Sequence, residues 1–120
     1  MKTVSQEIQD LSIESLRSTF SKLSNAYKST TEKGSNTTLV KKRLSAVKIG
    51  LESLKGTWNG EDFCYEQEII LTSKEVLQDI IPSIEKQLAK AKEGSSQKTL
   101  NKRRLTALKL AIESLDNRLI

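Results

Sequence analysis

The sequence predicts an all-α protein, an up-down-up-down four-helix bundle made of two tandem, sequence-related helical hairpins. The main observation is an internal repeat, because residues 38–54 (TLVKKRLSAVKIGLESL) recur as residues 99–115 (TLNKRRLTALKLAIESL). Ten of the 17 positions are identical without a gap, and the two runs start 61 residues apart in a chain of 120. A repeat of this length indicates a duplicated helical unit. Glycine (5) and proline (1) are scarce, which disfavours a fold with many turns.

The first hairpin is expected within residues 1–60. Its first helix starts after Thr3 or after Ser12 and ends at Gly34, because glycine takes the left-handed conformation that closes a helix. Ser35 or Asn36 then caps the second helix, which is the first copy of the repeat and runs to about residue 55. Apolar residues of the first helix recur at the spacing of one helix face: Ile13, Leu16, Phe20, Leu23 and Tyr27.

The second hairpin is expected within residues 61–120, after a linker at residues 56–71 that is rich in aromatic and acidic residues. Thr72 and Glu75 form a T-x-x-E capping box, which predicts the start of the third helix. Gly94 repeats the Gly34 turn, and the fourth helix is the second copy of the repeat, ending near Asn117. We therefore expect one domain, residues 1–120. The alternative is an open pair of hairpins that closes its core by forming a homodimer.

The composition disfavours an enzyme, a cofactor site and a metal site. The chain has no histidine, and its one cysteine, Cys64, has no second cysteine to pair with, so zinc sites and Cys/His or Ser/His nucleophiles are not expected. Paired carboxylates occur only in the linker. No run of 18 apolar residues predicts a membrane span, and the N-terminus does not resemble a secretory signal, so we expect a cytoplasmic protein.

A helical wheel of the repeat separates the core from the surface. Eight residues are expected to share one buried core: Leu44, Val47, Leu51, Leu54, Leu105, Leu108, Ile112 and Leu115. Arg43 and Arg104 lie inside this apolar arc, where they are interpreted either as covering the core with their stems or as paired with an anion. Ile49 and Leu110 lie on the polar side in both copies. With Trp58 of the linker, they are predicted to form a solvent-accessible contact patch for another chain.

The basic residues of the repeat form the second candidate site. They occupy the N-terminal part of each copy: Lys41, Lys42, Arg43, Lys102, Arg103 and Arg104. In an up-down bundle the Gly34 and Gly94 turns lie at the same end, so all six would form one basic end, with the acidic linker at the other end. The alternative interpretation is an ordinary solvated helix face.

The favoured function is a non-enzymatic protein-interaction module. Binding of nucleic acid or another polyanion through the basic end is the alternative, because clustered Lys and Arg can reach phosphates. It is less favoured, since no base-reading motif is visible and no aromatic residue interrupts the basic run.

The turn Trp58-Asn59-Gly60 resembles the Trp-x-Gly turn of the small secreted helical-hairpin proteins of the WXG100 type. In that family the turn joins the two helices of one hairpin, whereas here we expect it to join two hairpins. The Tyr-x-x-x-Asp/Glu tail signal of the family is missing from the C-terminal ESLDNRLI. Bacteriocin-immunity proteins are likewise small basic four-helix bundles, and this similarity is one of shape. Both comparisons imply a secreted or immunity-type helical protein as a second alternative function.

Overall fold

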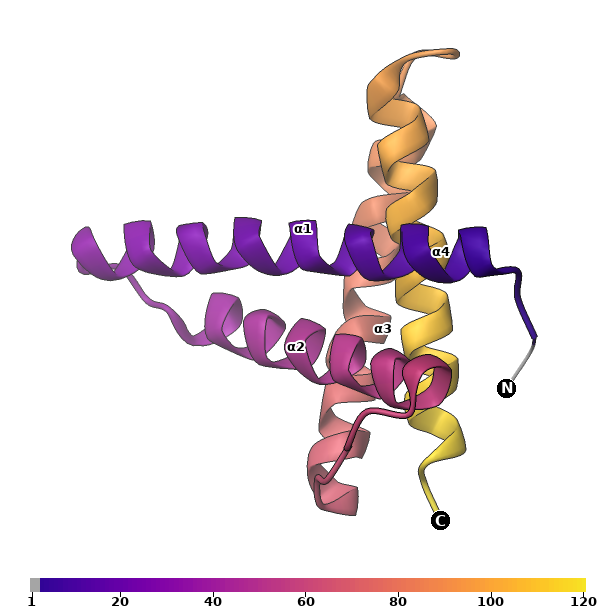
Figure 1. The fold of residues 1–120 in the computed structure, drawn as a ribbon. Coiled ribbons are helices and arrows are strands. Elements are labelled where there is room, and N and C mark those ends of the chain that lie inside the picture. Colours follow the sequence, from indigo (N-terminus) through magenta and orange to yellow (C-terminus); the bar gives the residue numbers. More distant parts are fainter. Residues whose placement is uncertain (1–2) are drawn as a thin grey trace.

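The computed structural model describes residues 3–120, which form four α-helices. α1 (Gln6–Glu32) pairs with α2 (Thr38–Asn59), and α3 (Gln67–Lys90) pairs with α4 (Ser96–Asn117). Each pair is an antiparallel hairpin closed by a short turn (Figure 1). Residues 3–120 contain no strand. The predicted all-α four-helix bundle of two hairpins is confirmed.

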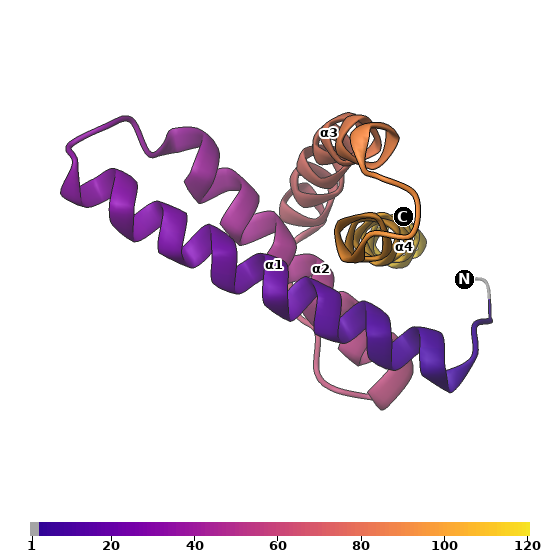
Figure 2. The same cartoon turned by 90° about the horizontal axis from the view of Figure 1, so that it is seen from above.

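The two hairpins cross each other instead of lying side by side along one axis (Figures 1 and 2). The molecule measures 38 × 37 × 20 Å. Helices of 22 residues are about 33 Å long, so a bundle with parallel axes would have one long dimension and two short ones. The turns at Gly34 and Gly94 therefore point in different directions. The prediction that they lie at the same end is wrong.

The predicted turn residues close both hairpins. Gly34 and Gly94 have φ angles of 70° and 77°, the left-handed conformation that other residues rarely take. The N-cap of α2 is Thr37, whose side chain makes no capping hydrogen bond, so neither Ser35 nor Asn36 is the cap that the sequence predicts; Asn36, one residue earlier, accepts a hydrogen bond from the backbone N–H of Thr38 (2.9 Å). The Ser95 hydroxyl accepts one from the N–H of Lys98 (3.2 Å) at the start of α4.

The linker between the hairpins is shorter than the sequence predicts. α2 continues to Asn59, and Gly60 (φ 71°) ends it, so Trp58 belongs to the last turn of a helix. α3 begins at Gln67, and the predicted capping box at Thr72 and Glu75 lies inside it. The N-cap residue, Glu66, makes no side-chain hydrogen bond, so no local capping motif marks this start.

The core confirms part of the predicted set and corrects another part. Val47, Leu54, Leu108 and Leu115 are buried, and the other four predicted core residues are half-buried: Leu44, Leu51, Leu105 and Ile112. Ile49 and Leu110, expected on the surface, are only 4% and 7% exposed. The prediction that these two side chains form a solvent-accessible contact patch is wrong.

Small residues in α2 explain this error. A Cβ atom added to Gly50 would lie 3.2 Å from the Cβ atom of Ala111 and 3.0 Å from Cδ1 of Leu77, so α3 and α4 pack very close to α2 at this point. The centre of the buried face therefore falls on the small side chains near Gly50. The buried face of α2 is therefore turned by about 60° about the helix axis from the face that the helical wheel predicts, and this rotation buries Ile49.

Equivalent positions of the two repeat copies meet where α2 crosses α4. The hydroxyl oxygens of Ser53 and Ser114 are 2.6 Å apart, and Gly50 faces Ala111; each pair is separated by the repeat offset of 61 residues. The starts of α1 and α3, at Gln6 and Gln67, differ by the same offset. Contacts between equivalent surfaces are the pattern of an interface with two-fold symmetry. The two hairpins are therefore arranged around an approximate two-fold axis between α2 and α4.

Candidate functional site

An open groove of about 690 Å³ lies between the N-terminal parts of α2 and α3. Its apolar lining is Ala46, Ile69 and Val76, with hydroxyl groups from both helices beside them. Lys41 and Lys42 line the α2 side. The groove thus combines an apolar surface with two positive charges.

The groove-lining residues follow the helical repeat of each wall. On α3 they recur every three to four residues, from Glu68 and Ile69 through Thr72 to Val76, which places them on one face. On α2, Lys41 and Ser45 are likewise one turn apart. Neither helix closes over the other here, because the crossing brings the two helices together nearer the centre of α2.

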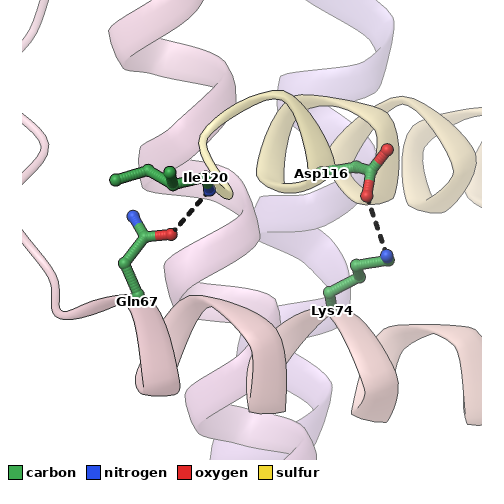
Figure 3. Close-up of polar contacts among 4 residues, drawn as sticks. All are labelled: Gln67, Lys74, Asp116 and Ile120. Atoms are coloured by element: carbon green, nitrogen blue, oxygen red, sulfur yellow. Dashed lines mark hydrogen bonds and ion pairs between the residues drawn. The ribbon is translucent and has the colours of Figure 1, made fainter.

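The α3 wall is fixed to the C-terminal part of the chain through its other face. Gln67 donates to the carbonyl oxygen of Arg118 (2.9 Å) and accepts from the N–H of Ile120 (2.9 Å). Lys74, two turns further on, pairs with Asp116 at 2.8 Å (Figure 3). These contacts hold the beginning of α3 in place without a capping motif, and they leave the face with Ile69 free to line the groove.

A smaller crevice of about 110 Å³ lies at the corresponding place between α1 and α4. Three of its lining residues are the repeat counterparts of groove residues: Arg103 for Lys42, Leu11 for Thr72 and Ser15 for Val76. Arg103 and Leu11 are larger than their counterparts, whereas Ser15 is smaller than Val76, so the two cavities have different linings.

The structure divides the predicted basic site into two. Lys41 and Lys42 line the groove, whereas Arg103 and Arg104 line the crevice. Arg43 is half-buried, and Lys102 is exposed outside both cavities. The prediction of a single basic end is wrong, because the N-terminal parts of α2 and α4 diverge from the crossing point (Figure 1).

Arg104 is the most constrained of these basic residues. Its Nε atom is buried without an acceptor, and burial lowers the pKa of its guanidinium. One turn earlier, the Oδ1 atom of the buried Asn101 also has no hydrogen-bond partner. A buried polar atom without a partner destabilises the fold, because it loses its hydrogen bonds to water and forms no hydrogen bond within the protein.

The aromatic residues near the linker pack against the bundle. Trp58, Phe63 and Tyr65 are partly buried against the core. The Tyr65 hydroxyl donates a hydrogen bond to Glu52, which, with burial, raises the pKa of Tyr65 to about 12. Trp58 is therefore half-buried, and its predicted role as a contact residue stays a prediction; the Cys64 thiol is exposed.

Arg118 locks the end of α4 onto α2. Its Nε donates to the hydroxyl of Ser53 (2.7 Å), and its Nη2 donates to the carbonyl oxygen of the same residue (2.9 Å). The guanidinium lies 4.0 Å from the ring centre of Phe63, and burial lowers its pKa. All these interactions are internal, so we assign the cluster to stability.

Sequence reasoning missed a set of exposed apolar residues. Leu39 is 58% exposed, and Ile69 in the groove is 42% exposed. The signal that could have found them is the repeat, because their counterparts Leu100 and Ile8 are also exposed, at 37% and 40%.

Three further findings bear on the possible function. Within residues 3–120 no group of three or more His, Cys, Asp or Glu residues could hold a metal ion. None of the four helices described is both long and apolar enough to cross a membrane. No protein-family model, curated protein or solved structure matches the chain.

Proposed function

We propose that this protein is a non-enzymatic, cytoplasmic interaction module that binds an acidic amphipathic helix of a partner protein in the groove between α2 and α3. The observation that carries the proposal is the pairing of an apolar groove surface with two lysines. The exposed thiol of Cys64 fits a reducing compartment, which supports the cytoplasmic location.

The charges favour an acidic partner. Lys41 and Lys42 face a single acid, Glu68, among the groove-lining residues. Neither lysine forms an ion pair within residues 3–120. Charge complementarity at the rim of an interface steers association and sets register. The acids of a partner would therefore lie on the α2 side of the groove, away from Glu68.

The shape favours a helix over a small molecule. Small-molecule sites bury most of the ligand surface in a concave pocket, whereas this groove is open along its length. An amphipathic helix binds such a surface by laying its apolar face into it, with side chains spaced by three and four residues as anchors. Exposed Leu39, next to the groove-lining Thr38, offers further apolar surface to such a partner.

A synthetic acidic amphipathic peptide tests the proposal. The probe is a helix of about 16 residues with leucine on one face and glutamate on the other, long enough to follow the groove for about 24 Å. We expect binding by isothermal titration calorimetry, with NMR shift changes at Ile69, Thr72 and Val76. Lys41→Glu with Lys42→Glu should weaken binding at least about tenfold, since each change reverses a favourable charge pair.

Lys48→Glu is the matched control, because Lys48 is an exposed lysine of α2 outside the groove. It makes the same charge change as the single variant Lys42→Glu, which is measured beside it, and should leave affinity nearly unaltered. If Lys48→Glu weakens binding as much as Lys42→Glu, the attraction is a general effect of the net charge of +5. That result would overturn the proposal, as would a probe that does not bind at all.

A further inference from the structure

We infer that the protein has two docking sites of the same kind, related by the approximate two-fold axis, and that its partner presents two acidic helices at once. The second site is the α1–α4 surface around the crevice. This inference rests on the proposed function of the groove and extends it to the other half of the molecule.

The exposed apolar residues carry the inference. Ile8 on α1 and Ile69 on α3 occupy equivalent positions and are exposed to nearly the same degree, 40% and 42%. Leu39 on α2 and Leu100 on α4 form a second equivalent pair. Leu100 lines the crevice, and Ile8 lies one turn before the crevice residue Leu11. Large apolar side chains left in water at both copies of a site indicate a surface that another molecule covers.

The charges recur with the apolar residues. Arg103 lines the crevice as Lys42 lines the groove, and one acid lies on the opposite wall of each cavity, Glu14 on α1 and Glu68 on α3. Arg104 adds a half-buried guanidinium whose Nε has no acceptor. The α1–α4 surface therefore offers an acidic helix the same combination of groups as the groove.

Duplication of one ancestral hairpin does not by itself explain why the two surfaces carry the same exposed apolar and basic residues. Over α1, only seven of 27 positions match their counterparts 61 residues later, at Gln6, Glu7, Ile8, Ser12, Glu14, Leu16 and Glu32. Ser12 and Leu16 are buried, so packing accounts for them. Ile8 is exposed, and Gln6 pairs with Asp10 (2.9 Å) instead of with the C-terminus as Gln67 does. Ile8, at 40% exposure, keeps much of its apolar surface in water, so packing explains its retention less well than it explains that of Ser12 and Leu16.

The two sites differ in depth, which sets an expected difference in affinity. The crevice is about 110 Å³ and the groove about 690 Å³. A helix at the crevice would bury less of its surface. We therefore expect a tighter site at α2–α3 and a weaker site at α1–α4, both for the same ligand. A half-turn about the axis exchanges the two sites, so the matching partner is a symmetric pair of acidic helices.

The test uses the same leucine–glutamate peptide and counts the sites. We expect two peptides per protein by native mass spectrometry, with two unequal affinities by calorimetry. Lys42→Glu should weaken only the tighter site, and Arg103→Glu only the weaker one, each by about tenfold. NMR shift changes at Ile69 and at Ile8 report the two sites separately. Far-UV circular dichroism checks that the variants fold, which we expect because both side chains are exposed.

The repeat supplies matched controls, since Lys48 and Lys109 are equivalent, exposed and outside both cavities. Lys48→Glu and Lys109→Glu should leave both sites intact. A single site that Lys42→Glu removes and Arg103→Glu leaves unchanged would overturn the inference while the proposed function stands. Failure of the wild-type protein to bind the probe would overturn both.

Discussion

Truncating the two buried repeat residues, Ile49 and Leu110, should strongly destabilise the protein. Both side chains are more than nine-tenths buried. Removing a buried Ile or Leu side chain down to alanine costs about 2–5 kcal/mol, from lost burial and from the cavity left behind. The free energy of unfolding of a domain is about 5–15 kcal/mol, so either single change removes a large fraction of it.

Urea unfolding measures this loss. The single tryptophan, Trp58, is partly buried against the core, so its fluorescence reports unfolding. With a denaturant slope of about 2 kcal/mol per molar, a loss of 2–5 kcal/mol lowers the urea midpoint by about 1–2.5 M. We expect this shift for Ile49→Ala and for Leu110→Ala separately.

Leu39→Ala and Leu100→Ala are the matched controls, because they are a repeat pair of similar size that stays exposed. Their midpoints should change little, since surface substitutions usually alter stability by less than about 0.5 kcal/mol. The reasoning fails if all four variants unfold at the wild-type urea concentration. It also fails if the exposed pair proves to be the destabilising one.

Three other outcomes are expected. Asn101→Val should raise the unfolding free energy by about 1 kcal/mol, because it removes a buried oxygen that has no hydrogen-bond partner. Valine is the residue at the equivalent position, Val40. A lower urea midpoint for this variant would contradict the prediction. In a Tyr27→Phe background, phenolate absorbance should show Tyr65 ionising near pH 12, and Glu52→Gln should lower that pKa. Because the pKa is raised in the folded protein, the Tyr65 hydrogen bond stabilises the fold fully below pH 10.0 and is lost as the pH rises towards 12. A Tyr65 that ionises at its ordinary pKa would refute the contact. Any binding to duplex DNA should show a log–log salt slope no steeper than about −2.7, because the N-terminal parts of α2 and α4 diverge and each carries at most three of these cations; a slope near −5 would mean that both helices bind together.

Local chemistry made the hairpins predictable from the sequence. Gly34 and Gly94 mark turns that require a left-handed backbone, and Ser95 caps the helix that follows Gly94 as its side chain allows. These features depend on a few neighbouring residues, so they can be read without knowledge of the rest of the chain. The repeat then indicated that the second hairpin has the form of the first.

The start of α3 could not be predicted in the same way. Its first turn is held by Gln67, which binds the backbone of Arg118 and Ile120 more than 50 residues away. The T-x-x-E pattern at Thr72 is a valid capping motif locally. Tertiary contacts start the helix earlier, at Gln67, so Thr72 lies inside α3 and does not act as a cap.

The binding surfaces depend on the crossing of the hairpins, which helix periodicity does not encode. Gly50 and Ala111 determine how closely α2 and α4 approach, and this turns Ile49 inward. The same crossing separates the two basic clusters and opens the groove beside Lys42. A helical wheel shows which side of one helix is apolar, but it does not show where the neighbouring helices pack or at what angle they cross.

The short link at residues 60–66 changes how strong the α2–α4 contact has to be. Two halves joined by a short tether meet at an effective concentration of about a millimolar, far above that of most free proteins in a cell. The contact between Gly50, Ser53 and their counterparts therefore needs only an intrinsic affinity somewhat better than millimolar. Gly50, Ala111 and the two serines let α2 and α4 approach closely, and the tether keeps this contact formed while the large apolar side chains of both hairpins pack into one core around it.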